Sequence, residues 1–154
     1  MTTASILFVC LGNICRSPLA EAALRAEAER AGIDIVVDSA GIGDWHVGRA
    51  PDHRAQATAL RQGIDISAYR ARQVTRGDFT RFTHIFALDP DNLADLRALA
   101  PGDAGAELGL LLDLLPERAG QGVVDPYYGA ADGFEATWSD VSDAARALVA
   151  RLAA

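Results

Sequence analysis

A cysteine, an arginine and a Ser-Pro pair stand close together near the start of the chain, directly after a short apolar run. The run is Ile6–Val9, and Cys10, Arg16, Ser17 and Pro18 follow it. A short apolar run rich in β-formers predicts a buried strand. Ser followed by Pro is typical of a helix start, with Ser17 as the N-cap. We therefore expect a strand, a tight loop and a helix.

Such a strand–loop–helix segment is suited to binding a tetrahedral anion such as phosphate. Backbone N–H groups and the positive end of the helix dipole converge on one point. Arg16 adds a planar fork that can hold two phosphate oxygens. The same groups favour the thiolate form of Cys10, which predicts nucleophilic attack on a bound phosphorus. The alternative is that Cys10 is a small buried hydrophobic residue, which leaves the loop chemistry unexplained.

A proton donor would assist this reaction on an aryl phosphate. The leaving phenolate has a conjugate acid with a pKa near ~10, so it benefits from general acid catalysis. Two Asp-Pro pairs could supply the acid. Asp125 lies in a long late loop among aromatic residues, whereas Asp89 follows a predicted strand. The aromatic neighbours favour Asp125, but spacing alone leaves Asp89 as an alternative.

Aromatic residues could form flat walls for a phenyl group. Trp45 lies in a loop without strand or helix periodicity, and Tyr127 and Tyr128 follow Asp125. Each aromatic contact contributes roughly 0.5–1.5 kcal/mol beyond area burial. The alternatives are that Trp45 covers the core as a lid, and that the tyrosines pack in the core with their hydroxyls at the surface.

Strands and helices alternate along the whole chain, which positions these residues. Helices are predicted at residues 19–31, 52–61, 92–100 and 134–152, with a helical turn at 78–82. Strands are predicted at residues 6–9, 33–38, 83–88 and 107–112, the last of which reads equally well as helix; turns or loops follow at 39–43, 44–51 and 116–133. The alternation predicts an α/β fold, a single domain spanning residues 1–154, with a doubly wound four-stranded parallel sheet and helices on both faces. Ligands bind such sheets at the carboxyl ends of strands, where Cys10 stands.

The first helix is predicted to present an alanine- and leucine-rich face to the core, including Ala20 and Leu24. Its charged residues, Glu21 and Arg25 among them, fall largely on other faces. Gly32 is the expected C-cap.

Composition limits the function classes. The chain has 154 residues, half of them hydrophobic, and a net charge of −7, which argues against nucleic acid as a partner. It lacks an 18-residue apolar run and a basic N-terminal start, so we expect no membrane association and a cytoplasmic location. The two cysteines fit a reducing compartment. No histidine has metal-ligand spacing with them, and we expect neither metal nor organic cofactor.

The nine residues from Cys10 to Pro18 resemble the signature of the low-molecular-weight protein tyrosine phosphatase family. Asp125-Pro-Tyr-Tyr resembles the family's acid loop, which favours Asp125 over Asp89. The resemblance implies hydrolysis of protein phosphotyrosine and small aryl phosphates through a phosphocysteine intermediate. It implies Cys10 as nucleophile, Arg16 as phosphate clamp and Asp125 as general acid and base. The implied ligands are a phosphotyrosine protein substrate and inorganic phosphate or oxyanion inhibitors; we expect a monomer.

The resemblance also implies supporting roles for other residues. Phosphate binding and loop support fall to Leu11, Gly12, Asn13, Ile14, Cys15, Ser17 and Ser39. The implied substrate walls are Trp45 and Tyr127, whereas the role of Tyr128 stays open. Ser17 would also donate to Cys10. Asn13 would be braced in a network with Ser39, in which relatives commonly have a histidine where this chain has Tyr69. The Tyr69 hydroxyl could replace one of that histidine's hydrogen bonds, but its reach is longer, so the bracing of Asn13 here stays open.

Two loop residues carry further expectations from the resemblance. Ile14 implies phosphotyrosine as the substrate, because relatives that act on phosphoarginine have threonine at the matching position. Cys15 is either a small structural side chain or a resolving thiol that captures oxidised Cys10 as a disulfide.

Two other functions are compatible with parts of the sequence. An arsenate reductase shares the fold and the Cys-x5-Arg loop, but it needs a downstream cysteine pair, and this chain has only Cys10 and Cys15. A non-catalytic phosphate-binding module would not need Cys10, Arg16 and Asp125 together. The missing Gly-Lys-Ser/Thr ending excludes a nucleotide-binding P-loop.

Overall fold

The centre of the molecule is a four-stranded, all-parallel sheet with strand order β2-β1-β3-β4. The computed structural model describes residues 3–130 and 132–154. The strands are β1 (Ser5–Cys10), β2 (Val36–Gly41), β3 (His84–Ala87) and β4 (Glu107–Leu110). Cys10 pairs with Gly41 at the carboxyl end of β1. The predicted α/β fold is confirmed, including the strand at residues 107–110, where the pattern had left helix open.

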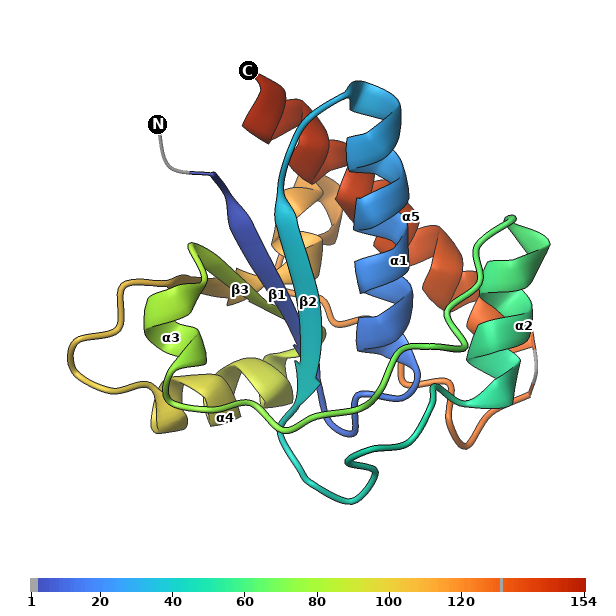
Figure 1. The fold of residues 1–154 in the computed structure, drawn as a ribbon, viewed down its shortest axis with the longest axis horizontal. Helices are drawn as coiled ribbons and strands as arrows, with labels where there is room; N and C mark the ends of the chain where they lie inside the picture. The colour runs from blue at the N-terminus through green and yellow to red at the C-terminus, as the bar shows by residue number, and fades with distance from the viewer. Residues whose placement is uncertain (1–2, 131) are drawn as a thin grey trace.

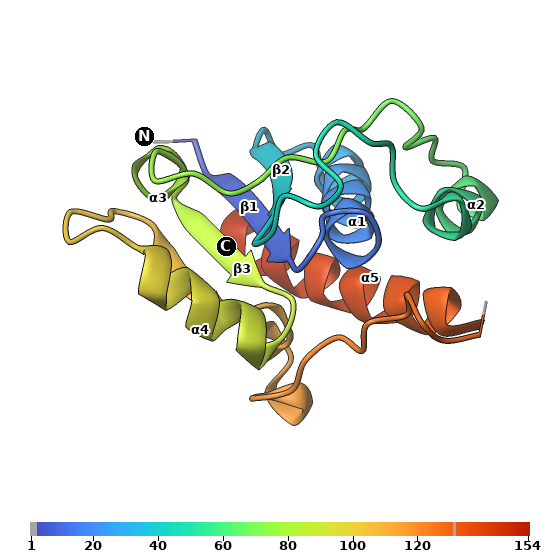
Figure 2. The ribbon, with the colours of Figure 1, turned by 90° about the horizontal axis from the view of Figure 1, so that it is seen from below.

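Helices cover both faces of this sheet (Figures 1 and 2). On one face lie α1 (Arg16–Ala31) and α5 (Asp132–Ala153), which pack against each other, and α2 (His53–Arg61) contacts both. On the other face lie α3 (Asp78–Arg81) and α4 (Pro90–Leu99). Successive residues of β1 point to opposite faces, so Phe8 and Leu7 belong to two separate hydrophobic clusters.

The second strand begins and ends three residues later than predicted. It spans Val36–Gly41 rather than residues 33–38, and the N–H of Val36 donates to the carbonyl of Ala4 just before β1. Ile33 and Ile35 only pack at the margin of the core. Ser39 therefore lies within a strand, and not in the predicted turn, because pairing with β1 overrides the local signal of the glycines.

The first helix starts differently from the prediction. Its N-cap is Cys15, without a side-chain cap, and Ser17 lies within the first turn. Ser17 as N-cap is therefore wrong, because its hydroxyl contacts Cys10 Sγ at 3.0 Å instead. Pro18 fits there because N–H groups of the first turn lack intrahelical partners. Gly32 ends the helix as predicted, in the left-handed region with φ 67°.

The segment between β4 and α5 runs past the carboxyl ends of the strands. It contains two short 3₁₀ helices, Leu111–Leu114 and Pro116–Arg118, and then an irregular loop up to residue 130. No helix in residues 3–130 and 132–154 has the length and apolar character needed to cross a membrane.

Candidate active site

A cavity of about 400 Å³ opens where the loops after β1 and β2 meet the segment that precedes α5. Figure 1 shows all three segments at the carboxyl end of the sheet. The cavity is lined by Cys10, Leu11, Gly12, Ile14, Cys15, Arg16, Trp45, His46, Asp125, Tyr127 and Tyr128. The structure thus brings together the predicted nucleophile, clamp, acid and walls, which lie far apart in the sequence. The predicted supporting residues Asn13, Ser17 and Ser39 do not line the cavity.

The sulfur of Cys10 is buried and lies within hydrogen-bond distance of the loop that follows it and of the first turn of α1. The N–H of Asn13 donates to Sγ at 3.3 Å, and Ser17 Oγ lies 3.0 Å from Sγ. Asn13 has φ 59°, a left-handed conformation that asparagine tolerates better than most residues. In the part of the chain that the structure describes, the N–H groups of Gly12, Ile14 and Cys15 donate to no protein acceptor. These donors suit an anion beside the sulfur.

Arg16 is only 3% exposed and is held along one edge of its guanidinium. Nη1 donates to Asp89 Oδ2 at 2.7 Å and to the carbonyl of Val123 at 2.9 Å. Nη2 lies 3.6 Å from Asp125 Oδ2. Burial by itself would lower the pKa of Arg16, but negative charge at Cys10, Asp89 and Asp125 outweighs it and raises the pKa. Arg16 therefore stays cationic in the cavity.

The loop that carries Asp125 is fixed on both sides of this residue. Before it, the N–H of Val123 donates to the carbonyl of Leu88 at 2.8 Å. After it, Arg54 donates to the carbonyl of Tyr127 at 3.0 Å, and its guanidinium lies 5.7 Å from the centre of that ring. The Asp125 carboxylate accepts the N–H of Tyr127 at 3.1 Å and is 40% exposed, so a substrate can reach it.

Aromatic rings surround the mouth of the cavity. Trp45 is 66% exposed, which rules out the alternative of a lid on the core. A Cβ at Gly43 would lie only 1.9 Å from its ring, so the indole rests on a glycine backbone. His46, which its place beside Trp45 in the sequence puts near the site without a catalytic role, lines the cavity with its ring centre 6.4 Å from that of Tyr127. Tyr128 is 93% exposed and meets Tyr127 edge-on.

Residues 11–15, the loop between β1 and α1 that we name the phosphate loop, are braced from behind through Asn13. Its Nδ2 donates to Ser17 Oγ at 2.8 Å and to Ser39 Oγ at 3.0 Å, and its Oδ1 accepts the N–H of Arg72 at 3.0 Å. Tyr69 is not among these partners. Instead, Ser39 donates to the buried carboxylate of Glu21 at 2.7 Å. Sequence reasoning placed Glu21 off the apolar face of α1 and therefore missed this contact.

The family model described as low molecular weight phosphotyrosine protein phosphatase matches residues 5–154. The chain belongs to this family. A low molecular weight phosphotyrosine protein phosphatase of Drosophila melanogaster is 44% identical over 135 residues, covering 86% of each chain. The structure of Primo-1 is 40% identical with a TM-score of 0.93, covering 99% of this chain and all of the other.

A protein tyrosine phosphatase from Entamoeba histolytica with Hepes in the active site is 33% identical, with a TM-score of 0.91 and coverage of 98% and 97%. The resemblance drawn from the opening loop and the Asp-Pro-Tyr-Tyr segment is thus confirmed. So is the enzyme class, a low molecular weight protein-tyrosine phosphatase, which is a hydrolase.

Proposed function

We propose that this phosphatase hydrolyses phosphotyrosine in proteins through a phosphocysteine on Cys10. The observation that supports this most directly is that Cys10, Arg16 and Asp125 line one cavity, with the sulfur hydrogen-bonded by its own loop. Positioning and charge stabilisation account for most catalysis of phosphoryl transfer. Arg16 and the loop N–H groups would hold the three equatorial oxygens as charge shifts onto the leaving group.

In the first step, the Cys10 thiolate attacks phosphorus in line. The S–P bond forms, the bond from phosphorus to the tyrosine oxygen breaks, and Asp125 gives its proton to that oxygen. In the second step, water attacks phosphorus and Asp125 takes up its proton. The S–P bond breaks, and inorganic phosphate leaves with Cys10 again a thiolate.

The walls of the cavity support an aryl phosphate as substrate. Trp45 and Tyr127 offer flat faces at the mouth of the cavity, and the apolar Ile14 lines it within the loop that follows Cys10. Inorganic phosphate and other tetrahedral oxyanions would bind as inhibitors to the same loop N–H groups and Arg16. The Hepes molecule in the Entamoeba relative carries a sulfonate, which is consistent with that preference.

Cys10→Ser with Cys15→Ser as the matched control tests this mechanism. Turnover of p-nitrophenyl phosphate and of phosphotyrosine, phosphoserine and phosphoarginine peptides should be measured for both variants. Cys10→Ser should abolish turnover, whereas Cys15→Ser should retain it, with phosphotyrosine preferred. Rapid acid quench and mass spectrometry of the wild type should find phosphate on Cys10. Turnover by Cys10→Ser, or phosphate on another residue, would refute the mechanism; a wild type that binds phosphotyrosine without turnover would be a binding module.

A further inference from the structure

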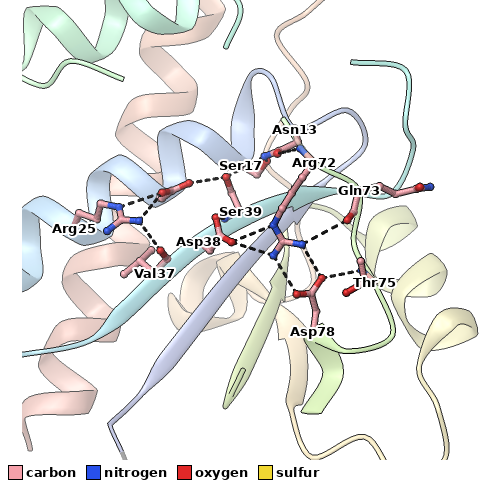
Figure 3. Close-up of polar contacts among 11 residues, drawn as sticks. Asn13, Ser17, Arg25, Val37, Asp38, Ser39, Arg72, Gln73, Thr75 and Asp78 are labelled. Carbon is pink, nitrogen blue, oxygen red and sulfur yellow. Dashed lines mark hydrogen bonds and ion pairs between the residues drawn. The ribbon is translucent and has the colours of Figure 1, made fainter. Parts of the chain in front are cut away.

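Glu21 is a buried carboxylate beneath the phosphate loop that the proposed mechanism does not use. Its side chain is 7% exposed, and each carboxylate oxygen has its own partner. Oε2 accepts from Nε and Nη2 of Arg25 at 3.1 and 2.8 Å, and Oε1 accepts from Ser39 Oγ at 2.7 Å. Arg25 also donates to the carbonyl of Val37 at 2.6 Å, which ties α1 to β2 (Figure 3).

The hydrogen-bond partners of Asn13 and the serines fix a direction for each proton. Because Ser39 gives its single hydroxyl hydrogen to Glu21, its oxygen accepts from Asn13 Nδ2. The N–H of Arg72 donates to Asn13 Oδ1, so the amide cannot be reversed. The second Nδ2 hydrogen goes to Ser17 Oγ. The hydroxyl hydrogen of Ser17 is then available for the sulfur 3.0 Å away.

We propose that the ion pair of Glu21 and Arg25 is a positioning element of this phosphatase. Through Ser39 and Asn13, the carboxylate keeps the hydroxyl of Ser17 directed at the nucleophilic sulfur and so stabilises the thiolate. The inference rests on the proposed function, since it concerns the same sulfur. Figure 3 shows that the network runs from α1 across β2 to the phosphate loop.

The charge on Glu21 decides which way the Ser39 hydrogen bond runs. An ionised carboxylate can only accept. A protonated carboxyl would donate to Ser39, whose own hydrogen would then face the Nδ2 hydrogens of Asn13. Two donors would oppose each other, and Asn13 would move. Arg25 keeps the carboxylate ionised and therefore keeps the hydrogen bonds of Ser39 and Asn13 in the directions given above.

The groups facing Glu21 act in opposite directions on its charge. Burial raises its pKa, the hydrogen bonds from Ser39 and Arg25 lower it, and the negative charge of Asp38 on β2 raises it, with a net rise. Tyr69 also faces the carboxylate, and burial together with the charge of Glu21 raises the pKa of its phenol. Tyr69 thus stays neutral, and Arg25 is the cation that balances the buried carboxylate.

Glu21→Gln tests the proposal with almost no change in shape. The amide has a single oxygen, which Arg25 requires, so its NH₂ group faces Ser39 and produces the opposed donors described above. The pH midpoint of Cys10 alkylation by iodoacetamide should rise by about one unit, or about tenfold less thiolate below the midpoint. The acid limb of kcat/KM for p-nitrophenyl phosphate should shift equally. Glu29→Gln, which makes the same charge change at an exposed site of α1, should change neither.

A double-mutant cycle with Ser39→Ala separates a proton-directing role from a structural one. Without the Ser39 hydroxyl, Glu21 has no route to Asn13, so Glu21→Gln should add little further shift. Arg25→Met should lower the amount of Cys10 thiolate relative to the wild type, and this deficit should increase as pH falls. Arg25→Lys should restore the wild-type profile. If Glu21→Gln folds poorly, Arg25→Met and Arg25→Lys still test the proposal.

The outcomes distinguish this inference from the proposed function. If Cys10→Ser abolishes turnover and Glu21→Gln leaves the alkylation midpoint unchanged, the positioning role is wrong. Equal shifts from Glu21→Gln in the wild-type and Ser39→Ala backgrounds would also overturn it. If Cys10→Ser retains turnover, the proposed mechanism itself fails, whatever Glu21→Gln does.

Discussion

The carboxylate of Asp89 holds the guanidinium of Arg16. Its Oδ2 accepts from Arg16 Nη1 at 2.7 Å, and its Oδ1 caps α4 by accepting the N–H of Asn92 at 2.8 Å. Both oxygens of Asp89 are therefore engaged in holding structure. Asp125 is the carboxylate that lines the cavity and that a substrate can reach.

Asp89→Asn should weaken the phosphate clamp without altering acid catalysis. Its amide oxygen can still cap α4, but its NH₂ group then faces Nη1, so Arg16 loses a charge-assisted bond. Such bonds contribute about 1.5–3 kcal/mol, which corresponds to a loss in kcat/KM of about tenfold or more. Rates for a series of aryl phosphates should fall by one common factor. A loss that grows with leaving-group basicity would identify Asp89 as the acid.

Asp125→Ala should produce the complementary pattern. Poor leaving groups need the proton most, so their kcat/KM, which reports the first step alone, should fall about 10²–10⁴-fold, while kcat/KM for good leaving groups should stay close to the wild-type value. A plot of rate against leaving-group pKa for both proteins provides the measurement. Equal slowing across the series would contradict Asp125 as the proton donor.

Gly43→Ala should displace the indole of Trp45, because the new Cβ would lie 1.9 Å from its ring. The KM for p-nitrophenyl phosphate should rise about three- to tenfold, as expected for a lost aromatic contact. The inhibition constant of inorganic phosphate, which does not reach the wall, should stay unchanged. Gly102→Ala is the control, since a Cβ there meets nothing within 4 Å. A parallel weakening of phosphate would show that Gly43 shapes the phosphate loop instead.

Cys15 should remain unreactive where Cys10 reacts. Burial, followed by the negative charge of Asp52, raises the pKa of the Cys15 thiol strongly, so it stays protonated at neutral pH. Iodoacetamide should then modify Cys10 alone, as peptide mass mapping would show. If Cys15 nevertheless resolves oxidised Cys10, peroxide should inactivate Cys15→Ser beyond recovery by thiols. Full recovery of this variant would leave Cys15 with a structural role only.

Asp78 should make the fold sensitive to acid. Burial would raise its pKa, but hydrogen bonds from Arg72 and the N–H of Thr75 outweigh burial and lower it. A lowered pKa stabilises the folded state above the unfolded value of about 3.9, and this contribution is lost as pH falls through the folded value. Asp78→Asn should cost about 2 kcal/mol near pH 7.

The acid dependence of that variant provides the control. Urea unfolding from about pH 6 to pH 3 should show a smaller loss of stability for Asp78→Asn than for the wild type, with exposed Asp95→Asn unchanged. If the three proteins lose stability in parallel, Asp78 does not carry the acid sensitivity.

The sequence predicted what depends on local pattern and on the motif. Alternating strands and helices gave the parallel sheet, and the nine residues from Cys10 to Pro18 gave the place of the nucleophile. The pattern of the sequence did not predict contacts between segments that are distant along the chain. The pairing of β2 with β1 moved Ser39 into a strand. Ser17 lies beside the Cys10 sulfur, as the resemblance implied, but it does not cap α1 as the local Ser-Pro pattern predicted.

Glu21 shows most clearly why the remainder could not be predicted. A glutamate among alanines is ordinarily a solvated residue of a helix surface. Here β2 lies against that turn of α1, so the carboxylate is buried between Ser39 and Arg25. Asp89 likewise was an alternative acid on spacing alone, and only the fold shows it beside Arg16.

The left-handed turn at Asn13 has a consequence for ligand exchange. Both polar ends of its amide are already bonded within the protein, and so is the N–H that its φ of 59° turns toward the sulfur. Folding alone therefore builds the receptor, and the ordering entropy of this turn does not oppose binding. Under the proposed function, an oxyanion would therefore bind a site that is already ordered, and exchange of product for substrate would require no rearrangement of the main chain at Asn13.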